Sequence, residues 1–195
     1  MIKLSVLDQS PIRTGAGPGE AFDDTLRLAK LADALGYHRY WLAEHHSSNG
    51  LAGSTPEILI GHIAANTRHL RVGAGGVMLS HYSPLKVAES FRVLETLYPG
   101  RIDLGIGRAP GSDGLTDQAL ATGPGKLGPQ HFPSQVNDLI GYLHDGLADD
   151  HPFNRIHASP RVETVPDLWL LGSSDQSAGI AAYFGIPAEN VTLRS

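Results

Sequence analysis

The sequence predicts an α/β protein built on a parallel β-sheet, because short apolar segments alternate with amphipathic helical segments. Five segments have the length and the β-branched or aromatic content of buried strands, namely residues 2–7, 39–43, 70–77, 101–107 and 168–172. Most of them recur at intervals of roughly 30 residues, which is the size of a βαβ unit. A chain of 195 residues is also long enough to bury one sizeable core.

Proline, glycine and hydroxyl residues mark the ends of the expected helices. Thr55-Pro56 and Ser83-Pro84 each place a capping residue before a proline at the first helical position. Gly36 should end a helix over residues 20–35, and Gly185 one over residues 174–184. A further amphipathic helix is expected to carry on one face Val136, Leu139, Ile140, Leu143 and Leu147.

Residues 109–134 differ in composition from the rest, with five glycines and four prolines. We expect a long loop over one end of the sheet, because strand and helix patterns resume after it. Two architectures accept this order of elements. One is an open, doubly wound sheet, and the other is part of a (β/α)₈ barrel, which typically needs about 250 residues.

Composition excludes several classes of function. The net charge of −5 offers no basic excess for nucleic acid, and a chain without cysteine has neither disulfides nor thiolate chemistry. A nucleic-acid partner is therefore not expected. A membrane partner is not expected either, because no signal peptide or long apolar segment is evident. These exclusions predict a soluble cytoplasmic protein.

Glu44-His45-His46 follows the second strand, at the edge where parallel α/β proteins bind ligands. His45 is a candidate catalytic residue, as a general base or hydrogen-bond donor. A histidine that serves only the structure is the alternative. Successive strand side chains point to opposite faces, so His45 and His46 should diverge, and no metal site is expected.

The third and fourth strands are rich in glycine but lack a dinucleotide fingerprint. Met78 and Pro110 occupy the positions of the third glycine in residues 73–78 and 105–110. Two interpretations of the strand glycines remain open. They allow close packing within the sheet, or they leave a bare surface against which a flat ring lies.

Two further features at the same edge suit an anion. Arg108 follows the fourth strand, and Ser173, Ser174 and Ser177 follow the fifth at the start of a helix. A surface ion pair and an ordinary serine N-cap are the alternatives. A base, a ring surface and a phosphate clamp at one edge together suggest flavin mononucleotide (FMN) or another phosphorylated cofactor.

Several linked motifs resemble the bacterial luciferase-like flavin monooxygenases, and they occur in order along the chain: residues 7–11, 41–46, 75–79, 83–89, 98–111 and 171–174. The resemblance implies a (β/α)₈ (TIM) barrel. Members of the family run well past 300 residues. We therefore expect an incomplete barrel of about the first five βα units over residues 1–187, followed by a polar tail at 188–195.

The resemblance also implies a chemistry and its participants. Such enzymes react reduced FMN with O₂ to a flavin C4a-peroxide and oxygenate a small organic substrate. The lack of a nucleotide fingerprint agrees with reduced FMN supplied by a separate flavin reductase.

Site roles follow from the same resemblance. His45 matches the histidine near the reactive edge of the flavin, and Gly75 and Gly76 match the segment under the ring, often with a cis peptide. The FMN phosphate would be held at Arg108, Ser174 and Ser177, with Ser173 beside them. A homodimer is expected. The alternative is a non-catalytic FMN-binding partial barrel, acting as a dimer or a truncated remnant.

Overall fold

A computed structural model describes residues 3–109, 113–120 and 128–189. They form one sheet of six parallel strands in sequential order, β1 (Ser5–Asp8), β2 (Arg39–Leu42), β3 (Arg71–Met78), β4 (Ile102–Gly107), β5 (Asp167–Leu171) and β6 (Ala188–Glu189). A doubly wound sheet needs a reversal of strand order, and this sheet has none. The partial barrel is therefore confirmed, and the doubly wound alternative is wrong.

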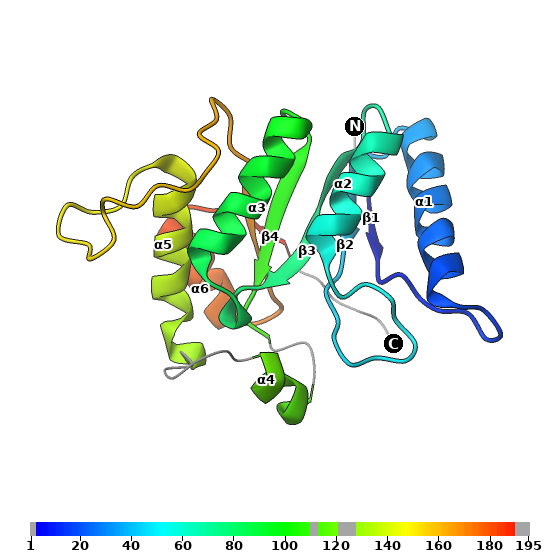
Figure 1. Cartoon of the computed structure of the whole chain (residues 1–195), viewed down its shortest axis with the longest axis horizontal. Coiled ribbons are helices and arrows are strands. Elements are labelled where there is room, and N and C mark those ends of the chain that lie inside the picture. The colour runs from blue at the N-terminus through cyan, green and yellow to red at the C-terminus, as the bar shows by residue number, and fades with distance from the viewer. Residues whose placement is uncertain (1–2, 110–112, 121–127, 190–195) are drawn as a thin grey trace.

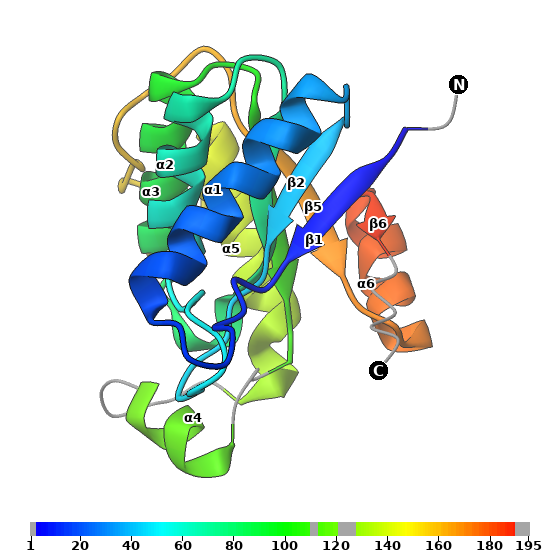
Figure 2. The same cartoon turned by 90° about the vertical axis from the view of Figure 1, so that its right-hand side faces the viewer.

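Helices connect the strands, as the sequence predicts. The described helices are α1 (Pro18–Ala34), α2 (Pro56–Asn66), α3 (Pro84–Leu97), α4 (Gly114–Leu120), α5 (Phe132–His144) and α6 (Asp175–Phe184), with 3₁₀ turns η1 (Leu79–His81) and η2 (Pro129–His131). Helices α1, α2, α3 and α5 pack side by side along one face of the sheet (Figure 1). Figure 2 shows α6 apart from them, next to β6.

The predicted helix ends are largely confirmed. Helices α2 and α3 begin at Pro56 and Pro84, and Gly36 and Gly185 adopt φ of 74° and 65° after α1 and α6. Helix α5 ends at His144, so the expected helical position of Leu147 is wrong. Asp145 turns into the left-handed region there, and the chain folds back against Gly141.

The segment predicted to be a loop over residues 109–134 contains the short helix α4. Its first turn is held by Asp113, whose carboxylate accepts hydrogen bonds from the backbone N–H groups of Leu115 (3.0 Å) and Thr116 (2.8 Å). An aspartate that caps a helix start gives a weak sequence signal among so many glycines and prolines. Residues 110–112 and 121–127 of this segment lie outside the described residues.

The hydrophobic core lies between the sheet and its helices. Alternate strand residues face it, including Val72 and Ala74 on β3 and Ile102, Leu104 and Ile106 on β4, all fully buried. The sheet therefore has an apolar convex face and a second, concave face.

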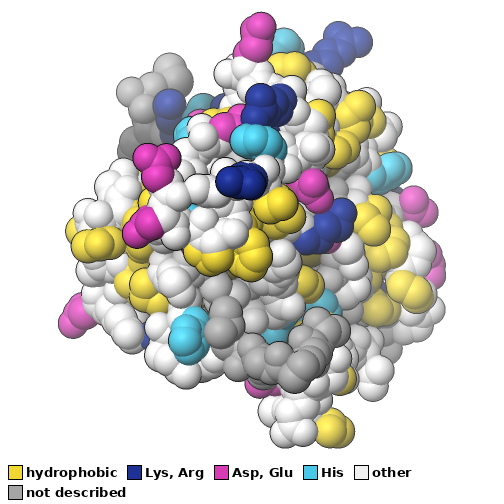
Figure 3. All heavy atoms as spheres, turned by 60° about the vertical axis from the view of Figure 1, so that its left-hand side comes forward, with side chains coloured by type: hydrophobic (Ala, Val, Ile, Leu, Met, Phe, Trp, Pro, Cys, Tyr) yellow, Lys and Arg dark blue, Asp and Glu magenta, His cyan; other side chains and the backbone are white. Residues whose placement is uncertain are grey.

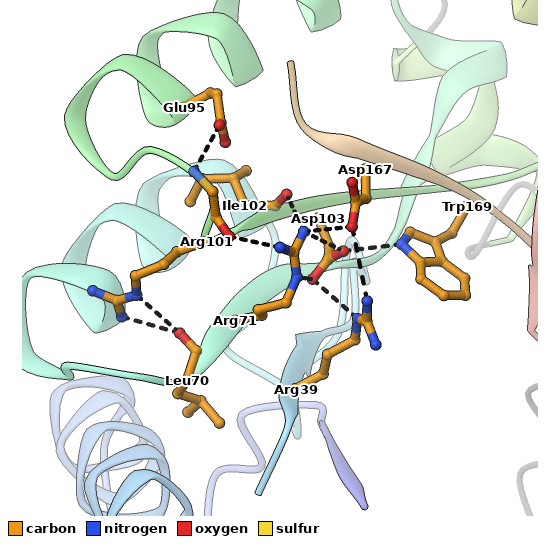
Figure 4. A network of polar contacts seen from close by, with 10 residues as sticks. Arg39, Leu70, Arg71, Glu95, Arg101, Ile102, Asp103, Asp167 and Trp169 are labelled. Atoms are coloured by element: carbon orange, nitrogen blue, oxygen red, sulfur yellow. Dashed lines mark hydrogen bonds and ion pairs between the residues drawn. The ribbon is translucent and has the colours of Figure 1, made fainter. Parts of the chain in front are cut away.

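The concave face is charged near the beginnings of the strands (Figure 4). The buried Asp103 accepts hydrogen bonds from Arg71 through Nε (2.9 Å) and Nη2 (3.0 Å), from Arg39 Nε (3.2 Å) and from Trp169 Nε1 (2.9 Å). Arg71 also forms an ion pair with Asp167 at 2.8 Å. This network links strands β2 to β5 across the sheet.

The sheet continues beyond residue 187, in the segment predicted to be a polar tail with at most one short strand. Ala188 and Glu189 form β6 and pair with Leu170 and Leu171 of β5. Tertiary pairing to an exposed strand edge overrides the weak strand propensity of these two residues. Residues 190–195 lie outside the described part, and the boundary at residue 187 stays a prediction.

The outer surface is mixed in character. On the face drawn in Figure 3, acidic and basic side chains are interspersed with hydrophobic ones. Among the described residues, every helix is too short or too polar to cross a lipid bilayer.

Candidate active site

A cavity of about 230 Å³ lies at the carboxyl ends of the strands. Five successive strand ends contribute to its walls, through Leu7 and Gln9, His45, Gly75 and Gly76, Gly107 and Arg108, and Ser173. The curvature of the parallel sheet brings these segments together. The cavity is thus at the edge that the sequence predicted.

His45 is half-buried in the cavity wall. Its backbone N–H donates to the carbonyl of Gly53 (2.9 Å), and within the described part of the chain no group bonds its Nδ1 atom. Burial lowers the pKa of His45 below its ordinary value, against an upward influence of Glu44. A neutral imidazole with one buried nitrogen that lacks a partner among the described residues therefore stands in the cavity wall.

His46 points elsewhere, as strand alternation predicted. Its Nε2 atom lies 2.7 Å from Oε1 of Glu44 and 3.3 Å from the hydroxyl of Tyr82. His46 does not line the cavity that His45 enters. Over residues 3–109, 113–120 and 128–189, no cluster of three or more metal-binding side chains occurs.

Gly75 and Gly76 line the cavity, and the peptide bond between them is cis. The close-packing interpretation of the strand glycines is confirmed, and the flat-ring interpretation stays a prediction. A Cβ atom at Gly75 would lie 2.9 Å from Cβ of Trp41, and one at Gly76 would collide with Leu171. These glycines therefore permit close packing inside the sheet, while their backbone forms one wall of the cavity.

Arg108 and the start of α6 lie on the other side of the cavity. Arg108 lines it and donates through Nη1 to Oε1 of Gln176. Ser173 also lines it, but Ser174 and Ser177 do not. Ser174 is the N-cap of α6, and its Oγ accepts from the Ser177 N–H (3.3 Å) and lies 3.1 Å from the Ser177 hydroxyl.

Residues 2–188 match the family described as luciferase-like monooxygenases. The chain belongs to this family. It is 54% identical over 185 residues to YwcH of Bacillus subtilis (strain 168) and 45% identical over 186 residues to N-acetyl-S-alkylcysteine monooxygenase of the same organism. Each match covers 95% of this chain and 55% of the relative.

Among solved structures, the crystal structure of apo-MsnO8 superposes with a TM-score of 0.88 at 45% identity. That match covers 97% of this chain and 55% of the other. The chain therefore spans about half the length of the relatives that it matches.

Several residues that line this cavity were not predicted as site residues, among them Gly107 and Gln9. Gly107 borders open space: a Cβ atom added there would meet nothing within 4 Å. Gln9 lines the cavity after β1. Both lie inside motifs that carry the family resemblance, residues 7–11 and 98–111, so that resemblance was the signal that could have found them.

For this luciferase-like protein, we expect the free energy of unfolding to fall as the pH is lowered from about 7 to 5, because His45 titrates in this range. The unfolded chain protonates His45 near its ordinary pKa of 6.5, and the folded chain only at lower pH, so acid favours unfolding. The variant His45→Gln should flatten the dependence in urea titrations. The pKa of His38 is also lowered, mainly by burial, so the double variant should flatten it further. An unchanged slope in both variants would contradict this assignment.

Proposed function

We propose that this protein is an FMN-dependent monooxygenase that uses O₂ to oxygenate a small organic substrate. In this proposal, reduced FMN comes from a separate flavin reductase, and the protein acts as a homodimer. The observation that carries it is the meeting of His45, Gly75, Gly76, Arg108 and Ser173 around one cavity in a chain of this family. The relative named N-acetyl-S-alkylcysteine monooxygenase supports oxygen transfer as the reaction class.

The residues present fit FMN by their chemistry. Leu7 and Leu171 supply apolar surface for a flat ring, and the open space at Gly107 leaves room beside them. His45 Nδ1 is a buried polar atom that a ligand would satisfy. Arg108 supplies a permanent positive charge for a phosphate group at the opposite side.

Reduced FMN, when bound, supplies the electrons that activate O₂. The protein's own residues would bind and orient it. The backbone of Gly75 and Gly76 supports the ring, His45 offers a neutral hydrogen-bonding nitrogen, and Arg108 with Ser173 holds the phosphate. Ser174 and Ser177, which are bonded to each other, would contribute mainly by ordering the start of α6.

Replacing Arg108 by alanine should weaken FMN binding about 10- to 100-fold, because a charge-assisted hydrogen bond of about 1.5–3 kcal/mol is lost. Riboflavin, which lacks the phosphate, should lose little affinity. Quenching of flavin fluorescence on titration with protein measures both ligands. The exposed Arg155 is the matched control, and Arg155→Ala should leave both affinities unchanged. Equal losses for FMN and riboflavin would contradict a phosphate contact.

The alternative is a non-catalytic FMN-binding partial barrel that pairs with a second copy. Among the described strands, β1 and β6 each pair on one side alone, and a strand edge of this kind can pair with another chain. The two proposals separate when the protein with bound FMNH₂ is mixed with O₂ and flavin reoxidation is followed by absorbance. Reoxidation of the bound flavin at the rate of free FMNH₂ would favour the alternative. Absence of saturable flavin binding would overturn both.

A further inference from the structure

Glu44 is a buried carboxylate that joins three segments of the chain. Its side chain is 1% exposed. Oε2 accepts from the backbone N–H of Met78 (2.9 Å), and Oε1 accepts from the Tyr82 hydroxyl (2.5 Å) and lies 2.7 Å from His46 Nε2. A buried carboxylate is costly unless it is hydrogen-bonded, and these three donors supply that compensation.

The direction of each bond follows from the chemistry of the groups. An ionised carboxylate only accepts, so Tyr82 must donate its hydroxyl proton and His46 must carry a proton on Nε2. Burial, and next the hydrogen bond to Glu44, raise the pKa of Tyr82, so its hydroxyl keeps the proton. Glu44 therefore selects one protonation pattern for its neighbours.

Glu44 itself is one of the residues that line the cavity. His45 is the next residue along the chain, and Met78 is two residues beyond Gly76 at the end of β3. Both His45 and Met78 line the cavity. The bond from Met78 N–H to Glu44 thus connects the segment that presents His45 to the segment that includes Gly75 and Gly76.

We propose that Glu44 is the positioning residue of the flavin site. Its carboxylate holds the end of β2 against the end of β3 and keeps His46 in the Nε2–H form, so that His45 faces the cavity. This inference rests on the proposed function for its link to FMN, but the geometry around Glu44 can be tested without any ligand.

The variant Glu44→Gln is the direct test. An amide has one oxygen, which can accept from Met78, and its NH₂ group must then face Tyr82 and His46. His46 would have to accept through Nε2 and carry its proton on Nδ1. The nitrogen chemical shifts of the His46 ring, assigned by loss of the signals in His46→Gln, should therefore report Nε2–H in the wild type and Nδ1–H in Glu44→Gln.

FMN affinity is the second measurement. We expect Glu44→Gln to bind FMN about tenfold more weakly, because the link between the two cavity walls is disturbed. The matched control is Glu57→Gln, since Glu57 lies beside Tyr82 in a neighbouring small cavity and does not line the proposed flavin site. It should change neither the His46 tautomer nor FMN affinity.

A second variant keeps the test decisive if Glu44→Gln does not fold. Tyr82→Phe removes one of the three donors and leaves the carboxylate in place. It should bind FMN a few-fold more weakly and leave His46 in the Nε2–H form. Unchanged FMN affinity in the folded Glu44→Gln, or in Tyr82→Phe if that variant alone folds, would overturn the inference. So would an Nδ1–H tautomer in the wild type.

The outcomes also separate this inference from the proposed function. If the wild-type protein does not bind FMN, but His46 is Nε2–H in the wild type and Nδ1–H in Glu44→Gln, the proposed function is overturned and the Glu44 geometry is retained. A wild-type protein that binds FMN, with Glu44→Gln identical to it, would overturn only the role of Glu44.

Discussion

Replacing Asp103 by asparagine is expected to lower the free energy of unfolding by about 3–5 kcal/mol, because it removes the buried charge that Arg39 and Arg71 share. Among the described residues, it leaves them only the exposed Asp167 as an anionic partner. The Asp103 side chain is 1% exposed and forms ion pairs with Arg39 and Arg71. An amide can keep one of its acceptor atoms but presents N–H groups to the guanidinium donors. Arg39 also lies 4.6 Å from the Trp169 ring centroid, so its displacement would disturb that packing too.

The matched control for Asp103 is Asp167→Asn. The Asp167 side chain is 56% exposed and pairs with Arg71 in the same network. A solvent-exposed pair of this kind contributes about 0–1 kcal/mol. Urea unfolding followed by tryptophan fluorescence measures both variants. Comparable losses for the two substitutions would show that burial does not govern the strength of this network.

Replacing Gly105 by alanine should destabilise the fold by about 1–3 kcal/mol or more, the range observed for overpacked cores. The added Cβ atom would collide with the carbonyl oxygen of Ala74 and lie 2.6 Å from Cδ1 of Leu171. The Ala74 carbonyl belongs to the neighbouring strand β3, so relief requires the sheet itself to shift. Thermal or urea unfolding gives the change in stability.

Gly107→Ala is the matched control, because it makes the same change two residues further along β4. Its Cβ atom would meet nothing within 4 Å, so stability should change by less than about 0.5 kcal/mol. It would instead occupy space beside the cavity and weaken FMN binding. Equal destabilisation by the two alanines would refute the packing argument.

Secondary structure was largely predictable because its signals are local. Pro56 and Pro84 begin helices directly after Thr55 and Ser83, although neither of these side chains makes a capping hydrogen bond. Gly36 and Gly185 follow helices in backbone conformations that other residues rarely adopt.

The differences from prediction have separate causes. The start of α4 rests on Asp113, a local signal that is weak among so many glycines and prolines. The pairing of Ala188 with Leu170 needs a contact between segments that are apart in the sequence.

The position of the candidate site was predictable for a related reason. Parallel strands place their carboxyl ends at one edge, so His45, Gly75 and Arg108 could be assigned to the same region without coordinates. What could not be assigned was the wall to which each side chain belongs. Ser174 and Ser177 bond to each other outside the cavity, whereas the unassigned Gly107 and Gln9 line it.

The amino-acid sequence by itself determined the order of strands and helices, the edge where the cavity forms and the family resemblance. These properties follow from periodicity, chain punctuation and motif spacing, which act over short stretches. Only the tertiary structure decided that Glu44 bonds to Met78 and Tyr82, and that Asp103 pairs with two arginines from other strands. Those partners are 30 or more residues apart along the chain, and only the register and curvature of the sheet bring them within hydrogen-bond distance.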